Sequence, residues 1–227
     1  MRPPATETAR TADALLPAAD GWRLLRFGVL ATAEHAPLDS SPRWLALAAP
    51  SGPFRPVQAV AAQRGYFLLV DAASSRLCLY DADAALLSTF PLPEAFTPFT
   101  PGRSAVFRGA DGAFTFLDYT SGEAWQFADR LPGDGNARWV MRGRTRLPAG
   151  LRDCVQVPGS TALLCRAGRD APVQFDGALN RVPARGDAVG GLRATWDAQA
   201  GAWAFSREGD AVRFIPALRR LEGAPAP

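Results

Sequence analysis

The sequence contains no lysine, a single isoleucine and a single histidine. All 25 basic residues are therefore arginines, a bias that indicates a GC-rich genome before it indicates any function. The one histidine, His35, lies in the loop-like segment AEHAPLD. Hydrolytic triads and most zinc sites need histidine, often more than one, so neither is expected here. We expect His35 to be structural or solvated.

Several motifs that carry chemistry are also missing. No CxxC pair occurs, which excludes a zinc ribbon and a thioredoxin-like motif. There is no Gly-rich phosphate loop and no G-x-S-x-G nucleophile elbow. The segments DADAA and GADGA lack the ligand spacing of a calcium loop. The turn aspartates are therefore expected to cap their own backbone, and they are Asp81, Asp83, Asp111, Asp134 and Asp176. We predict no catalytic residue set, no metal and no cofactor.

The chain also lacks a run of 18 apolar residues, so no transmembrane helix is expected. Its first 20 residues hold only the short apolar run 14–19, interrupted by Pro17, which is too little for a secretory leader. As it stands the sequence predicts a cytoplasmic protein, and a missing leader would make it periplasmic. The net charge of +3 permits an acidic partner without requiring one.

What the chain does have is turn residues and short apolar runs. Its 21 glycines and 20 prolines disfavour long helices. Residues 1–20 are rich in Ala, Pro and Thr and are predicted to form an N-terminal tail. We assign residues 21–222 to a single domain and residues 223–227 to a C-terminal tail.

The clearest series of strands lies between Val57 and Leu92. It predicts strands over 57–61, 66–70, 76–80 and 85–90. Four short strands in succession form a meander, the repeat unit of a propeller blade. The third strand recurs as LCLY, AWQF, PVQF and AVRF. These copies close on Tyr80, Phe127, Phe175 and Phe214, at spacings of 47, 48 and 39 residues.

The strand before it recurs too, as GYFLLV, GAFTFL, STALLC and GAWAFS, which begin at residues 65, 112, 160 and 201. Such spacings match the length of propeller blades. Residues 21–50 hold two more predicted strands, 22–30 and 44–48, which suit a partial blade. We predict an all-β propeller of four clear four-stranded blades plus a partial N-terminal blade, about five in all, closed by strands from both chain ends. An open or cut-down larger propeller is the alternative.

One repeat carries a recognisable motif. Its apolar run ends at Val70-Asp71, Arg76 opens the next strand, and Tyr80-Asp81 closes it. This stretch, residues 65–92, resembles a repeat of the NHL class of β-propellers. The other units keep the strand spacing but not the motif, since the position of Asp71 is taken by Asp118, Arg166 and Arg207. The resemblance implies a propeller that binds protein or RNA, although some members are lyases or hydrolases with catalytic residues in the central channel.

Two of the three cysteines, Cys154 and Cys165, lie in CVQVPGSTALLC. If Gly159-Ser160 is a two-residue turn, residue 154 lies directly across from residue 165, close enough for a disulfide. In a reducing cytosol the two would stay as thiols. Without a leader, free thiols are the favoured prediction and a disulfide is the alternative.

The segment ARWVMRGRTRL is rich in arginine. At strand period two, Val140 shares one face with four of them: Arg138, Arg142, Arg144 and Arg146. The opposite face carries Trp139, Met141, Gly143, Thr145 and Leu147. This predicts the outer strand of a blade, with the arginines outward. The structural interpretation is a charged edge that blocks strand pairing. The functional interpretation is a docking surface for acidic protein, lipid headgroup or nucleic acid.

Nucleic-acid binding needs exposed aromatics among basic residues. Trp125 and Trp203 fall in repeated core strands, so we do not expect it. The leading hypothesis is a non-catalytic propeller that binds a protein partner through Arg138, Arg142, Arg144 and Arg146, as an accessory subunit of a larger assembly. Peripheral contact with a membrane complex is left open. The alternative is a lyase- or hydrolase-type enzyme, or a small-ligand sensor, with its site in the central channel.

Overall fold

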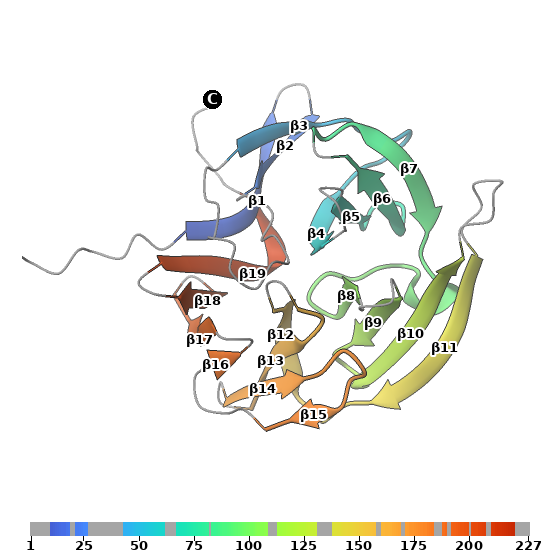
Figure 1. Ribbon diagram of the computed structural model, residues 1–227. Helices are drawn as coiled ribbons and strands as arrows, with labels where there is room; N and C mark the ends of the chain where they lie inside the picture. Colours follow the sequence, from blue (N-terminus) through green and yellow to red (C-terminus); the bar gives the residue numbers. More distant parts are fainter. Residues whose placement is uncertain are drawn as a thin grey trace, which may run out of the picture.

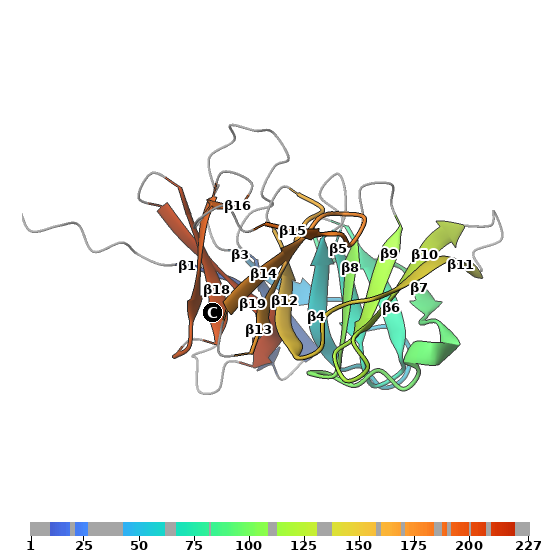
Figure 2. The same ribbon diagram turned by 90° about the horizontal axis from the view of Figure 1, so that it is seen from below.

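Strands dominate the chain and form four sheets around a common centre (Figure 1). The computed structural model describes residues 10–18, 21–26, 43–61, 67–81, 83–108, 113–130, 138–157, 160–168, 171–183, 188–189, 192–199, 201–207 and 210–220. Seen from the side, the sheets stand next to one another instead of stacking in layers (Figure 2). This is the arrangement of a β-propeller, so the predicted fold class is confirmed.

Three of the sheets are four-stranded antiparallel meanders. Blade 1 consists of β4 (Pro56–Ala61), β5 (Phe67–Asp71), β6 (Arg76–Tyr80) and β7 (Leu86–Pro91). Blade 2 consists of β8 (Ser104–Arg108), β9 (Phe114–Asp118), β10 (Glu123–Arg130) and β11 (Arg138–Arg146). Blade 3 consists of β12 (Leu151–Gln156), β13 (Leu163–Ala167), β14 (Ala171–Phe175) and β15 (Arg181–Val182). A short 3₁₀ turn, η1 (Glu94–Phe96), follows β7.

The fourth sheet closes the ring and has seven strands. One part is β16 (Ala188–Val189), β17 (Leu192–Asp197), β18 (Ala202–Arg207) and β19 (Asp210–Arg220). The other part is β1 (Arg10–Ala18), β2 (Gly21–Arg26) and β3 (Arg43–Leu47). The two parts join because β19 pairs in parallel with β1. The first and last parts of the chain therefore complete one sheet, as predicted for a closed propeller, and each covers the other's edge.

One boundary of the prediction is corrected by this closure. Arg10–Ala18 was assigned to an N-terminal tail but forms the strand β1. Its composition hid the strand, because its partner β19 lies about 200 residues away in the sequence. The prediction for residues 223–227 lies outside the described part of the chain.

Apolar clusters fill the spaces between neighbouring sheets. One joins blades 1 and 2 around Phe90 and Phe116, and another joins blades 2 and 3 around Phe107 and Phe175. The closing sheet packs on blade 1 through Leu47 and on blade 3 through two buried aromatics, Trp203 and Phe205. Three of the predicted closing aromatics are buried in these clusters: Tyr80, Phe127 and Phe175. The repeat therefore marks the core between the blades.

Candidate functional site

The innermost strands of the blades surround the centre of the propeller. In Figure 1, β4, β8 and β12 lie closest to the axis. β8 contacts both β4 and β12, and β4 and β12 each contact β19 of the closing sheet. These strands form no ladder with one another. Glutamine side chains bridge them instead. Gln58 on β4 donates to the carbonyl of Val106 at 2.7 Å and accepts from its N–H at 3.1 Å.

Gln156 on β12 makes the same pair of side-chain to backbone hydrogen bonds, here called a clip, from the other side of β8. Its Nε2 donates to the carbonyl of Arg108 at 2.7 Å, and its Oε1 accepts from the Arg108 N–H at 3.4 Å. Both backbone groups of two β8 residues are thus satisfied by side chains of the neighbouring blades. Because buried backbone groups need such partners, the clips hold the three inner strands in one register.

A pocket lies where these inner strands begin, at one end of β4, β8 and β12. Its volume is about 80 Å³. Apolar groups of Val57, Phe99 and Ala105 line part of it. The polar side chains in the lining come from all three blades and are Gln58, Ser104, Tyr119, Arg152 and Asp153. Apolar walls with a few convergent polar groups are typical of small-ligand sites.

A β-bulge in β12 shapes this pocket. The pairing of β12 with β13 shifts register between Arg152 and Val155. Asp153 takes up the extra residue with a φ of 50°, in the left-handed region. Aspartate tolerates that region better than most residues, but the conformation still costs on the order of 1 kcal/mol. Neighbours in a regular strand point to opposite faces, whereas here Arg152 and Asp153 both line the pocket.

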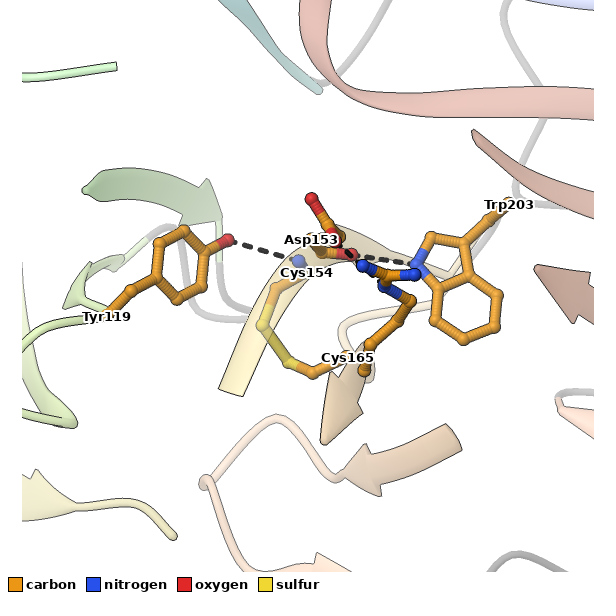
Figure 3. Close-up of a disulfide and its surroundings, with 6 residues drawn as sticks. Tyr119, Asp153, Cys154, Cys165 and Trp203 are labelled. Carbon is orange, nitrogen blue, oxygen red and sulfur yellow. Dashed lines mark hydrogen bonds and ion pairs between the residues drawn. A yellow bond between two sulfur atoms is a disulfide. The ribbon is translucent and has the colours of Figure 1, made fainter. Parts of the chain in front are cut away.

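Contacts from two sheets hold the bulge in place (Figure 3). Arg166 of β13 pairs with Asp153, with 2.8 Å between Nε and Oδ2. The indole N–H of Trp203, from β18, donates to the Asp153 carbonyl at 2.7 Å. The Arg166 guanidinium also lies over the ring of Trp196, 4.0 Å from its centroid. The strained residue is therefore fixed through both its side chain and its backbone.

A disulfide links Cys154, the next residue, to Cys165 on β13. The prediction of free thiols is thus wrong and its alternative correct: the two Cα atoms lie 4.0 Å apart, so the hairpin brings them within bonding reach. The Cys154 N–H donates to the hydroxyl of Tyr119 at 3.1 Å, across from blade 2 (Figure 3). Burial raises the pKa of Tyr119, so its hydroxyl keeps the proton and can donate it in a hydrogen bond.

The structure places the predicted arginines on β11, the outer strand of blade 2, as expected. Their assignment to one face is corrected, because a second bulge shifts the register between Gln126 and Phe127 of β10. On one side of the shift Arg144 pairs with Trp125, and on the other side Met141 pairs with Phe127. Trp125 and Phe127 are two residues apart and so lie on one face of β10. Their partners Arg144 and Met141 therefore share a face of β11. The side chain of Arg138 lies outside the described part of the structure.

The remaining predicted residues have local roles or cannot be placed. Asp81 Oδ1 accepts from the N–H groups of Asp83 and Ala85, and Asp176 Oδ1 accepts from those of Ala178 and Asn180. These are the predicted self-capped turns. Asp111, Asp134 and His35 lie outside the described residues. Within the described residues, no three acidic, Cys or His side chains gather into a metal-binding group.

Sequence reasoning missed the pocket residues. A signal for their neighbourhood existed, because adding the repeat of about 48 residues to the predicted strand 57–61 leads to β8 and β12. No sequence signal marked the bulge at Asp153, because the bulge depends on contacts with Arg166 and Trp203 from other strands.

No family model and no curated protein matches this sequence. Solved structures with a similar arrangement include virginiamycin B lyase from Staphylococcus aureus, at 11% identity and a TM-score of 0.38, over 93% of this chain and 67% of that one. A protein from Lactobacillus plantarum aligns at 15% identity and a TM-score of 0.37, over 89% of this chain and 64% of its own. A 6-phosphogluconolactonase-like protein from Bacteroides uniformis aligns at 15% identity and a TM-score of 0.38, over 86% of this chain and 63% of its own.

The chain thus spans about two thirds or less of the length of these structures. The prediction that it is not an enzyme is corrected by them, because propellers of this type include proteins named as lyase and lactonase. At this identity and TM-score the likeness assigns no activity. The resemblance of residues 65–92 to an NHL repeat stays a prediction. No helix among the described residues is long and apolar enough to cross a membrane.

Proposed function

We propose that this propeller binds a small polar molecule at the mouth of its central channel. The observation that supports this is the bulge at Asp153, which turns two neighbouring charged residues, Arg152 and Asp153, into one pocket. Bulges concentrate next to active sites because they re-aim side chains. Strained residues fixed by their surroundings also concentrate at functional sites. Here strain, bulge and pocket coincide.

The size of the pocket limits what it can enclose. Its volume of about 80 Å³ is roughly half that of a cavity that holds benzene. Pockets for drug-sized ligands run from about 300 Å³ upward. We infer that the pocket encloses one polar end of a ligand, of a few non-hydrogen atoms, while the rest lies in the channel mouth.

The lining sets the chemistry of that end. The Arg152 guanidinium carries five N–H donors, and one of its hydrogen bonds is to the carbonyl of Gly168 at 2.6 Å. Arginine recognises carboxylate and phosphate groups through paired donors. The hydroxyls of Ser104 and Tyr119 add donors of the same kind. The Asp153 carboxylate accepts, and suits a hydroxyl or amino group of the ligand. The ligand class is a small acid with an adjacent hydroxyl or amine.

A panel of such acids, with their uncharged amides, tests the proposal by thermal unfolding. A ligand at a hundred times its Kd stabilises by about 2.7 kcal/mol, which raises the Tm by about 5–10 °C for a chain of this length. We expect the shift for acids only, and its loss in Arg152→Ala. The matched control is Arg181→Ala, an exposed arginine on β15 of the same blade. Equal shifts for acids and amides, or for both variants, would contradict the proposal.

We further propose that the protein works in an oxidising compartment, outside the cytoplasm. The support is the disulfide between Cys154 and Cys165, since such bonds are rare in reducing cytosol. Thiol labelling of protein taken from its own cells under acid quench tests this. Unfolded protein should show one reactive thiol, Cys78, before reduction and three after it. Three thiols before reduction would contradict it and leave the pocket proposal standing.

A further inference from the structure

The outer strand of blade 2 differs from those of its neighbours. β11 has nine residues, whereas β7 has six and β15 has two. It ends its sheet, and no described strand pairs with its outer edge. Every second residue of such an edge presents its N–H and C=O outward. β11 thus offers the longest unpaired ladder among the three four-stranded blades.

This strand also exposes apolar side chains. Among the described residues, the large hydrophobic side chains that stand exposed are Leu87, Val140 and Met141, all on outermost strands. Met141 is 59% exposed and Val140 is 40% exposed, and as neighbours in the strand they point to opposite faces of β11. The indole of the preceding residue, Trp139, is anchored by its N–H to the carbonyl of Pro91 in blade 1. Met141, two residues on from Trp139, therefore stands out on the same face as this anchored indole.

The bulge places positive charge on the same face as Met141. Arg144 and Arg146 lie across from Trp125 and Glu123, on the same face as Met141. Arg144 pairs with Glu123 and lies over the ring of Trp125, 4.9 Å from its centroid, yet its side chain is 53% exposed. These contacts fix the direction of the guanidinium. One edge thus combines open backbone groups, an exposed apolar side chain and two cations, of which Arg144 is held in a fixed direction.

We propose that β11 receives an extended acidic segment of a partner protein as an added strand. The backbone edge pairs with the segment, as in other strand-addition complexes. Alternate carboxylates of the segment lie opposite Arg144 and Arg146, and one apolar side chain lies opposite Met141. Charge complementarity selects a protein segment of this pattern. A purely protective edge also carries charges and a bulge, but exposed Met141 and Val140 work against protection.

Synthetic nine-residue peptides test this by fluorescence anisotropy and amide exchange. One peptide alternates glutamate with valine and carries a leucine near one end, the second has the same residues with the glutamates adjacent, and the third has lysine for glutamate. We expect the alternating peptide to bind at least about tenfold tighter than the scrambled one. It should slow amide exchange over 138–146, while the lysine peptide does not bind.

Variants separate the elements of this surface. Arg144→Ala with Arg146→Ala, and separately Met141→Ala, should each weaken the alternating peptide by about five- to tenfold. Arg181→Ala on β15 is the control and should change nothing. Equal binding of the first two peptides, or binding without protection of β11, would overturn strand addition. So would an absence of peptide binding combined with capture of the protein by phosphatidylserine vesicles through the same arginines.

Discussion

Blade 1 and blade 3 each contain one closely paired aspartate and arginine, used in different ways. In blade 1, Asp71 and Arg76 face each other across the β5–β6 turn at 2.9 Å, and Asp71 is fully buried. In blade 3 the position of Asp71 is taken by Arg166, and its partner Asp153 has moved to the inner strand β12. Blade 3 therefore also has an ion pair, with 2.8 Å between Arg166 Nε and Asp153 Oδ2, but the arginine now holds the position that the aspartate has in blade 1.

The difference shows how the place of an ion pair decides its role. Asp71 accepts from the N–H groups of Arg55 and Ala73 as well as from Arg76, so all its bonds stay inside the blade. Asp153 keeps a third of its side chain exposed and lines the pocket. The first aspartate closes a turn, and the second presents a carboxylate to a ligand. Four perturbations, in order of expected effect, test this contrast.

The largest effect is expected for Asp71→Ala. Removing this buried carboxylate leaves the Arg76 guanidinium, 16% exposed, without its counter-charge, although it still donates to the carbonyls of Ser51 and Pro53. Two backbone N–H groups also lose their acceptor. Breaking a buried pair in this way costs about 3–5 kcal/mol of the free energy of unfolding. Urea unfolding measures it, with ligand binding in the folded fraction as the second readout. A loss below about 1 kcal/mol would show that the pair is not a structural latch.

Removing the disulfide is expected to have the next largest effect. Cys154→Ser with Cys165→Ser frees a loop with a sequence separation of 11, worth about 2–3 kcal/mol of stability. The third cysteine reports on the folded state, because burial raises the pKa of Cys78 to about 12. It should label only as the protein unfolds. The same variants should lose affinity at the pocket, since the disulfide adjoins Asp153, whereas a structural effect alone would leave it unchanged.

Asp153→Asn should change stability by only about 1 kcal/mol, because asparagine also tolerates a positive φ and still accepts a hydrogen bond from Arg166. Ligand affinity should fall by about tenfold or more. The matched variant in blade 1, Asp71→Asn, should show the reverse, with lower stability and unchanged affinity. Calorimetric titration gives the ligand affinity of each variant, and urea unfolding gives its free energy of unfolding. If both variants lost stability and affinity to the same extent, Asp71 and Asp153 would not have the separate structural and ligand-binding roles argued here.

Blade 2 provides the smallest effect, through Asp118 at the position of Asp71. Partial burial raises its pKa, but the N–H of Thr120 and the Arg103 guanidinium outweigh this, and the pKa ends below its ordinary value of 3.8. Its contribution is therefore complete above that value and is lost as pH falls through the lower folded-state pKa. Wild type and Asp118→Asn should differ by a few tenths of a kcal/mol near neutral pH. The difference should vanish in acid; one that grew there would contradict the sign.

The sequence was sufficient to predict the propeller because each blade repeats its own pattern. Alternation and turn residues predict a strand over Arg76–Tyr80, which is the extent of β6, and the closing aromatics Tyr80, Phe127 and Phe175 are buried as expected. Features that depend on partners far along the chain escaped prediction. The strand β1 needs β19, and the bulges at Asp153 and at Arg142 arise where ladders shift register. A one-residue shift changes which side chains share a face, and periodicity alone cannot report it.

The most direct test of the account is a nuclear magnetic resonance titration of labelled protein with small hydroxy acids, amino acids and phosphates. The account predicts that at least one of them shifts the Arg152 guanidinium signal and the amides of Ser104, which lines the pocket, and of Cys154, which donates to the pocket residue Tyr119. The Asp71 and Arg76 signals in blade 1 should stay in place. If every acid left the pocket signals unchanged at millimolar concentration, or shifted both blades alike, the channel mouth would not be the binding site.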